Sequence, residues 1–127
     1  MPALNRLPAT RIVAASSALD SAKWPAGALV LRIAADEVLV MPPIPAIELS
    51  DPHAIIAPEG GFAGAWMPVE EALMLLERHC EWELPGGRPA FAQGMVAGIP
   101  AKLWFENDRV LFLAPAPFVS DFEERMS

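Results

Sequence analysis

The residues best suited to catalysis are adjacent in the sequence: His79, Cys80 and Glu81 offer an imidazole, a thiol and a carboxylate. A nucleophilic thiol needs a base that faces it. Adjacent side chains on a helix point about 100° apart, so His79 does not face Cys80. Cys80 also falls on a predicted apolar stripe, where a free cysteine behaves as a small hydrophobic residue. We expect a core cysteine beside an exposed histidine; an independent enzyme would require Cys80 to react rapidly in the native protein.

The other motifs do not indicate a metal site or a phosphate loop. His53 has no partner at the spacing of an HxH, CxxC or HExxH motif. The glycine pairs Gly60-Gly61 and Gly86-Gly87 match neither GxGxxG nor GxxxxGK[ST] and are typical of turns. Glu70 and Glu71 are neighbours in sequence only, as a solvated helix start would place them. We predict no catalytic and no metal-binding residue.

Aromatic residues on one predicted strand indicate a binding surface. Trp104 and Phe105 are consecutive, so their side chains point to opposite faces, and both faces need cover. We expect one of them to meet a partner; the alternative is a core that extends over both faces. Arg88, just after the second glycine pair, is able to bind a carboxylate. The predicted partner-binding residues are therefore Trp104, Phe105 and Arg88.

Short apolar runs predict the strands that position these residues. Two aliphatic runs around Ala34–Glu37 predict a hairpin, and His53–Ala57 predicts a short strand ended by a turn at Pro58–Gly61. Phe62–Trp66 is ambiguous between a strand and an irregular approach to a helix. Further strands are expected at 90–97, 101–105 and 109–113, with a bend at 98–100 and a tight turn at 106–108.

Two segments predict helices. The first begins near Pro68 and ends before Leu84, and its apolar positions recur at three- and four-residue spacing. These positions are Val69, Ala72, Leu73, Leu76 and Cys80, with Leu75 widening the stripe. The second, at Phe118–Met126, is short and terminal. The fold class is α+β, a mostly antiparallel sheet with two helices on one face.

The length of 127 residues and the apolar fraction of 54% favour one compact domain over disorder. Residues 1–27 lack sustained periodicity, so we expect a loosely ordered N-terminal arm followed by a single α+β domain over residues 28–127.

The net charge of −7 repels phosphate backbones and anionic lipids, so we expect neither nucleic acid nor a membrane as partner. No stretch approaches the roughly 20 apolar residues of a spanning helix. Neither a signal-like N-terminus nor a second cysteine is present, and we expect a cytoplasmic protein.

A family resemblance is carried by packing and turn residues between Phe62 and Met126. They are Phe62–Trp66, Pro68, Ala72, Leu75-Leu76, Cys80, Leu84-Pro85, Phe91–Gln93, Gly98–Trp104, Val110–Leu113, Phe118 and Asp121-Phe122. On these residues the chain resembles the gamma subunit of heterotetrameric sarcosine oxidase. That family is related to the fold of the glycine cleavage T-protein, an aminomethyltransferase.

The resemblance implies a non-catalytic accessory subunit of a flavin-dependent oxidoreductase. Flavin, NAD and folate would belong to the large partner subunits, and this chain alone would bind none of them. The alternative function is a stand-alone binder of a flat, folate-like anion near Arg88 and Lys102. If no large subunit is present, we expect self-association, most simply as a two-fold dimer.

Overall fold

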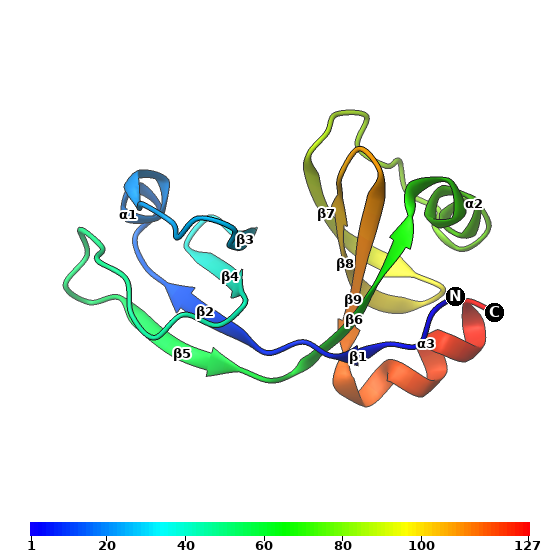
Figure 1. Ribbon diagram of the computed structural model, residues 1–127, viewed down its shortest axis with the longest axis horizontal. Coiled ribbons are helices and arrows are strands. Elements are labelled where there is room, and N and C mark those ends of the chain that lie inside the picture. Colours follow the sequence, from blue (N-terminus) through cyan, green and yellow to red (C-terminus); the bar gives the residue numbers. More distant parts are fainter. The chain divides into compact units, whose positions relative to one another are not determined.

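The computed structural model describes residues 1–127 and shows an α+β protein with two antiparallel sheets (Figure 1). The chain forms two compact units: the larger unit comprises Met1–Arg6 and Gly61–Ser127, and the smaller unit comprises Leu7–Gly60. In chain order the elements are β1 (Asn5–Arg6), β2 (Ala9–Val13), α1 (Ser16–Ser21), β3 (Leu29–Ala34), β4 (Glu37–Met41), β5 (Ile55–Glu59), β6 (Phe62–Pro68), α2 (Val69–His79), β7 (Ala90–Val96), β8 (Ile99–Phe105), β9 (Arg109–Pro115), a 3₁₀ turn (Ala116–Phe118) and α3 (Val119–Arg125).

This division differs from the expected arm at 1–27 and single domain at 28–127. The first 27 residues contain β1, β2 and α1, and the expected boundary falls inside the smaller unit. Strand β1 has only two residues, and β2 has the sequence ATRIV, in which polar Thr10 and Arg11 interrupt the apolar residues that would indicate a strand. Their partners lie far along the chain, on β4, β5 and β6, so the pattern of the first 27 residues alone does not reveal them.

The larger unit is built on a five-stranded sheet in the order β1-β6-β9-β8-β7. Residues of β8 alternate between buried and less buried positions, and Ala101, Leu103 and Phe105 lie on the buried face. The hydrophobic core on that face includes residues from both α2 and α3. The predicted meander is present, and Phe62–Trp66 belongs to a strand, β6.

Helix α2 follows from its sequence. Glu70 and Glu71 stand in its first turn and Arg78 and His79 in its last, where each sign of charge suits the helix dipole. Ala72, Leu75 and Leu76 are buried against the sheet. Leu73, expected on the apolar stripe, is 38% exposed, because the buried stripe is centred on Leu75 and Leu76 instead.

The β7–β8 connection is a two-residue turn with positive φ at both positions, 52° at Ala97 and 77° at Gly98. These angles match a type I′ hairpin. Strand β8 therefore starts at Ile99, where a bend at 98–100 was expected. Val96 and Ile99 are the pair that closes this turn, and Pro100 lies opposite Met95 at the next position. A residue at this non-hydrogen-bonded position donates no N–H to β7, so a proline is tolerated there.

The smaller unit is a four-stranded sheet in the order β3-β4-β2-β5. The predicted hairpin is confirmed, with Ala34 opposite Glu37. The predicted strand at 53–57 is β5, but it runs through Pro58 and Glu59. Ile12, Val38 and Val40 form the core of one sheet face with residues of α1 and of the connector after β4.

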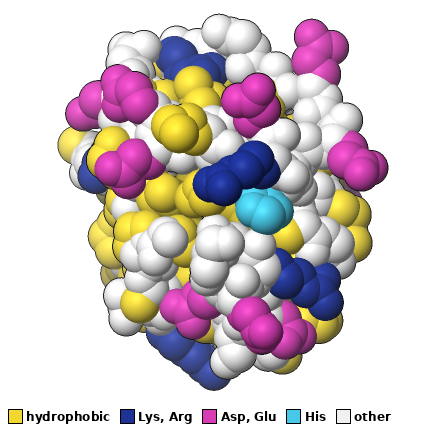
Figure 2. Space-filling model, turned by 90° about the vertical axis from the view of Figure 1, so that its right-hand side faces the viewer, with side chains coloured by type: hydrophobic (Ala, Val, Ile, Leu, Met, Phe, Trp, Pro, Cys, Tyr) yellow, Lys and Arg dark blue, Asp and Glu magenta, His cyan; other side chains and the backbone are white.

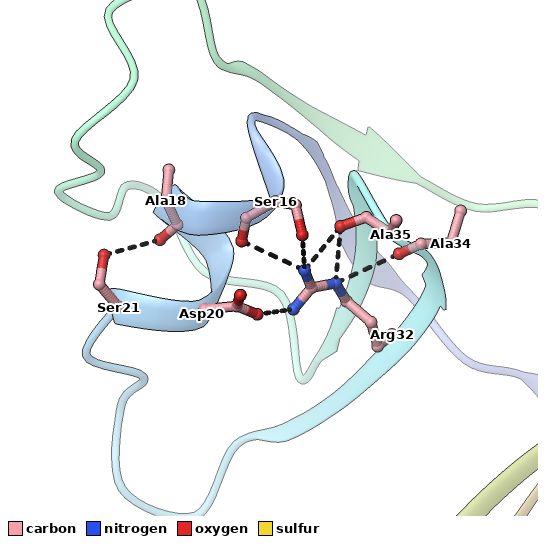
Figure 3. A network of polar contacts seen from close by, with 7 residues as sticks. All are labelled: Ser16, Ala18, Asp20, Ser21, Arg32, Ala34 and Ala35. Atoms are coloured by element: carbon pink, nitrogen blue, oxygen red, sulfur yellow. Dashed lines mark hydrogen bonds and ion pairs between the residues drawn. The ribbon is translucent and has the colours of Figure 1, made fainter.

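Hydrogen bonds of Arg32 link α1 to the β3–β4 hairpin (Figure 3). Its Nη1 donates to Asp20 Oδ1 at 2.9 Å and its Nη2 to both Ser16 O and Ser16 Oγ, at 3.2 and 3.0 Å. Its Nε and Nη2 also donate to the carbonyl of Ala35, at 3.0 and 2.6 Å. All three guanidinium nitrogens of Arg32 thus donate hydrogen bonds. The sequence alone does not reveal these contacts.

Candidate functional surface

The three predicted partner-binding residues do not lie together. Trp104 and Phe105 occupy opposite faces of the larger sheet, as expected for neighbours on a strand. Phe105 is completely buried in the core beneath the helices. The Arg88 guanidinium lies 4.9 Å from the Phe105 ring centroid and donates to the carbonyls of Pro85 and Gly87 at 2.9 and 2.7 Å. Of the three, Trp104 retains the indole that a partner could contact on the other sheet face.

Trp104 belongs to a row of apolar side chains across the sheet face opposite α2 and α3. The strand register places Phe91, Trp104, Leu111 and Trp66 side by side on β7, β8, β9 and β6. Leu111 is buried, whereas both tryptophans are only partly buried. The row therefore presents two indoles with accessible surface.

Three polar contacts fix these indoles. The Arg109 guanidinium lies 3.7 Å from the Trp66 ring centroid, a close cation–π stack. Arg109 Nε donates to Glu106 Oε1 at 2.8 Å, and Trp104 Nε1 donates to Glu106 Oε2 at 3.0 Å. We refer to Trp66, Trp104, Glu106 and Arg109 as the indole cluster.

Glu106 is the electrostatic centre of the indole cluster. The hydrogen bond from Arg109, followed by that from Trp104, lowers the pKa of the Glu106 carboxyl, and partial burial opposes this without reversing it. Glu106 therefore remains ionised at neutral pH and holds both donors.

Sequence reasoning missed Trp66, Glu106 and Arg109 as companions of Trp104. Two signals were available. The turn at 106–108 sets Glu106 and Arg109 three residues apart across its ends, and β6, once recognised as a strand, can pair with β9 so that Trp66 faces Leu111. The pairing of β6 with β9 is the step that a sequence pattern does not supply, because the paired residues Trp66 and Leu111 lie 45 positions apart in the chain.

Arg88 and Lys102, the basic residues expected near a folate-like anion, lie on opposite sides of the larger sheet. Arg88 stacks on Phe105 beneath the helices. Lys102 is three positions before Phe105 on β8 and points to the other face, where its Nζ donates to Gln93 Oε1 at 2.9 Å. The two cations do not converge on one ligand.

His79 and Cys80 lie where α2 ends. Cys80 is the C-cap residue with extended backbone, and its thiol donates to Trp82 O at 3.6 Å. Burial raises the pKa of the Cys80 thiol, and the hydrogen bond to Trp82 only partly offsets this. A raised pKa disfavours the thiolate that nucleophilic chemistry requires.

Exposed apolar side chains on α2 are a second surface feature. Leu73 and Met74 are 38% and 64% exposed, with Glu70, Glu71 and Glu77 on the same helix also exposed. On the side of the molecule shown in Figure 2, apolar side chains are interrupted by acidic and basic ones. This surface is not a single apolar patch.

No group of three or more His, Cys, Asp or Glu side chains is placed to hold a metal ion. None of the helices combines the length and apolar character needed to cross a membrane. Comparisons of the chain with protein-family models, with curated proteins and with solved structures find no match.

Proposed function

We propose that the protein is a non-catalytic accessory subunit that binds a larger, flavin-containing oxidoreductase in the cytoplasm. The indole cluster is the observation that supports this proposal. Tryptophan and arginine are the residue types most enriched at the energetic centres of protein interfaces. Here two partly exposed indoles and an arginine are held by defined contacts before any partner arrives.

Preorganisation is what makes the indole cluster suited to binding. Immobilising a flexible side chain at an interface costs about 0.5–1.5 kcal/mol. Because Glu106 already restrains Trp104 and Arg109 in the folded chain, these side chains lose little further conformational entropy when a partner binds. Under this proposal flavin, NAD and folate are held by the partner, and Trp104 is the principal contact of this chain.

The test is an affinity pull-down of the tagged protein from its host lysate, with the absorbance of the eluate read in the flavin region. We expect a stoichiometric yellow partner with the wild-type chain and its loss with Trp104→Ala. Phe118→Ala is the matched control, because Phe118 is an aromatic residue of the same unit, 43% exposed and outside the cluster. A colourless, self-associated product, or equal retention by Trp104→Ala, would contradict the proposal.

A further inference from the structure

The two sheets have four edge strands, β1 and β7 in the larger sheet and β3 and β5 in the smaller one. An edge strand offers N–H and C=O groups to any other strand, and proteins block such edges with charges, prolines, bulges or very short strands. Three of the four edges carry such a feature within the strand. Strand β1 has two residues, β3 has a register shift between Arg32 and Ala34, and β5 contains Pro58 and Glu59.

Strand β7 has none of these features. Its seven residues, Ala90–Val96, include no charged residue and no proline, and they pair with β8 without a register shift. In a second copy of the chain the same strand offers the same groups, and antiparallel pairing about a two-fold axis matches N–H with C=O. No like charges on β7 would oppose each other in that pair.

The turn between β7 and β8 sets which backbone groups of β7 point outward. A two-residue turn of this type closes on a hydrogen-bonded pair, here Val96 and Ile99. Met95 is therefore at a non-hydrogen-bonded position, and its N–H and C=O point away from β8. These groups lie on the side where a further strand would pair.

The indole of Trp82 lies on this outward side of β7. Its Nε1 donates to Met95 O at 2.8 Å, so the outward carbonyl already has a partner. Trp82 is partly buried and packs against the core of the larger unit. A Cβ added at Gly94 would come within 2.8 Å of the ring, so glycine is the residue that lets the indole approach the strand this closely.

The segment that carries Trp82 is itself held in place. Ala97 N–H donates to His79 O at 2.8 Å and links the end of α2 to the β7–β8 turn. The Cys80 thiol donates to Trp82 O at 3.6 Å. The indole is therefore a fixed cover of the β7 edge.

We propose that Trp82 blocks the β7 edge and prevents the chain from pairing through this strand with a second copy of itself. The protection comes from a residue outside the strand, whereas the other three edges carry theirs within it. The proposal does not depend on the accessory function above, because its test measures self-association and involves neither flavin nor a partner protein.

Sedimentation velocity of the full chain over a range of protein concentrations tests the proposal. We expect the wild-type chain to remain a monomer and Trp82→Ala to self-associate at least about tenfold more strongly. Val110→Ala is the control for lost stability, because Val110 is a fully buried residue of the same core on β9, an interior strand. This control should remain a monomer.

A substitution on β7 locates the contact. Met95→Pro removes the outward N–H but leaves the bonds to β8 in place, so Trp82→Ala combined with Met95→Pro should return to the monomer. Gly94→Ala displaces the indole without removing it and should self-associate as Trp82→Ala does. The test therefore does not require that Trp82→Ala folds.

Four results would overturn the proposal. Monomeric Trp82→Ala and Gly94→Ala would show that the indole does not protect the edge, and equal association of Val110→Ala would assign the effect to lost stability. Association of Trp82→Ala that persists with Met95→Pro would place the contact on another surface. A wild-type dimer dissociated by Met95→Pro would show that the edge is open despite Trp82.

Discussion

Ala97 has a φ of 52°, which is strained for a residue with a Cβ. The left-handed region costs a non-glycine residue about 1–2 kcal/mol, whereas glycine adopts it freely but loses more entropy on folding. Ala97→Gly should therefore raise the free energy of unfolding by about 0.5–1 kcal/mol in urea titrations. Gly98→Ala should lower it, since φ is 77° there and the new Cβ would lie 3.0 Å from Arg125 Nη1. Equal effects of the two variants would contradict the turn geometry.

The Trp82 ring packs directly against the backbone of Gly94. A Cβ added at Gly94 would come within 2.8 Å of the Trp82 ring, and Trp82 Nε1 donates to Met95 O at 2.8 Å. We expect Gly94→Ala to displace the ring and destabilise the protein by about 1–3 kcal/mol in chemical denaturation. Gly87→Ala is the matched control, because nothing lies within 4 Å of its added Cβ. Equal stability of the two variants would show that the ring yields freely.

The carboxylate of Glu106 links stability to pH. Its pKa is lowered by Arg109 and then by Trp104, so its contribution is complete above the ordinary value of 4.5 and is lost as pH falls through the lower folded value. Glu106→Gln lacks this titration. We expect the difference in melting temperature between the two proteins to be largest near pH 7 and to narrow on acidification below pH 4.5. A constant difference would mean that the charge is unimportant.

At the scale of elements, the connector after β4 is attached to β2 through Thr10. Thr10→Val keeps the shape of the side chain but leaves the N–H and C=O of Ile44 without this partner. We expect a loss of about 1–3 kcal/mol in the free energy of unfolding, the usual cost of buried groups left unbonded. Thr10→Ser retains the hydroxyl and should lose less. Greater damage from the serine variant would assign the role of Thr10 to its methyl group.

Local patterns predicted the elements better than their assembly. Apolar spacing placed α2, the meander and the β3–β4 hairpin, because each depends on neighbours in sequence. It did not place β1 or β2, which pair with residues more than 20 positions away. The same limit applies to the site: Trp104 and its strand were predicted, but Trp66 joins it only through the pairing of β6 with β9.

The whole molecule carries a net charge of −7 and has a pI near 4.7. Basic residues number 9 and several already hold partners, as Arg32 and Arg109 do. We therefore expect no mobility shift with a short DNA duplex at physiological salt, because few cations remain to release counterions. Salt-dependent retention of the protein on DNA or heparin would contradict this.

The chain enters and leaves the smaller unit between two pairs of antiparallel strands, β1 with β6 and β2 with β5. Arg6 pairs with Ala63 on β6, and Ala9 pairs with Glu59 on β5, so the strands that enter and leave Leu7–Gly60 run antiparallel to each other. The 54-residue stretch from 7 to 60 is therefore an insertion in topological terms: without it, every strand of the larger sheet still has its partner.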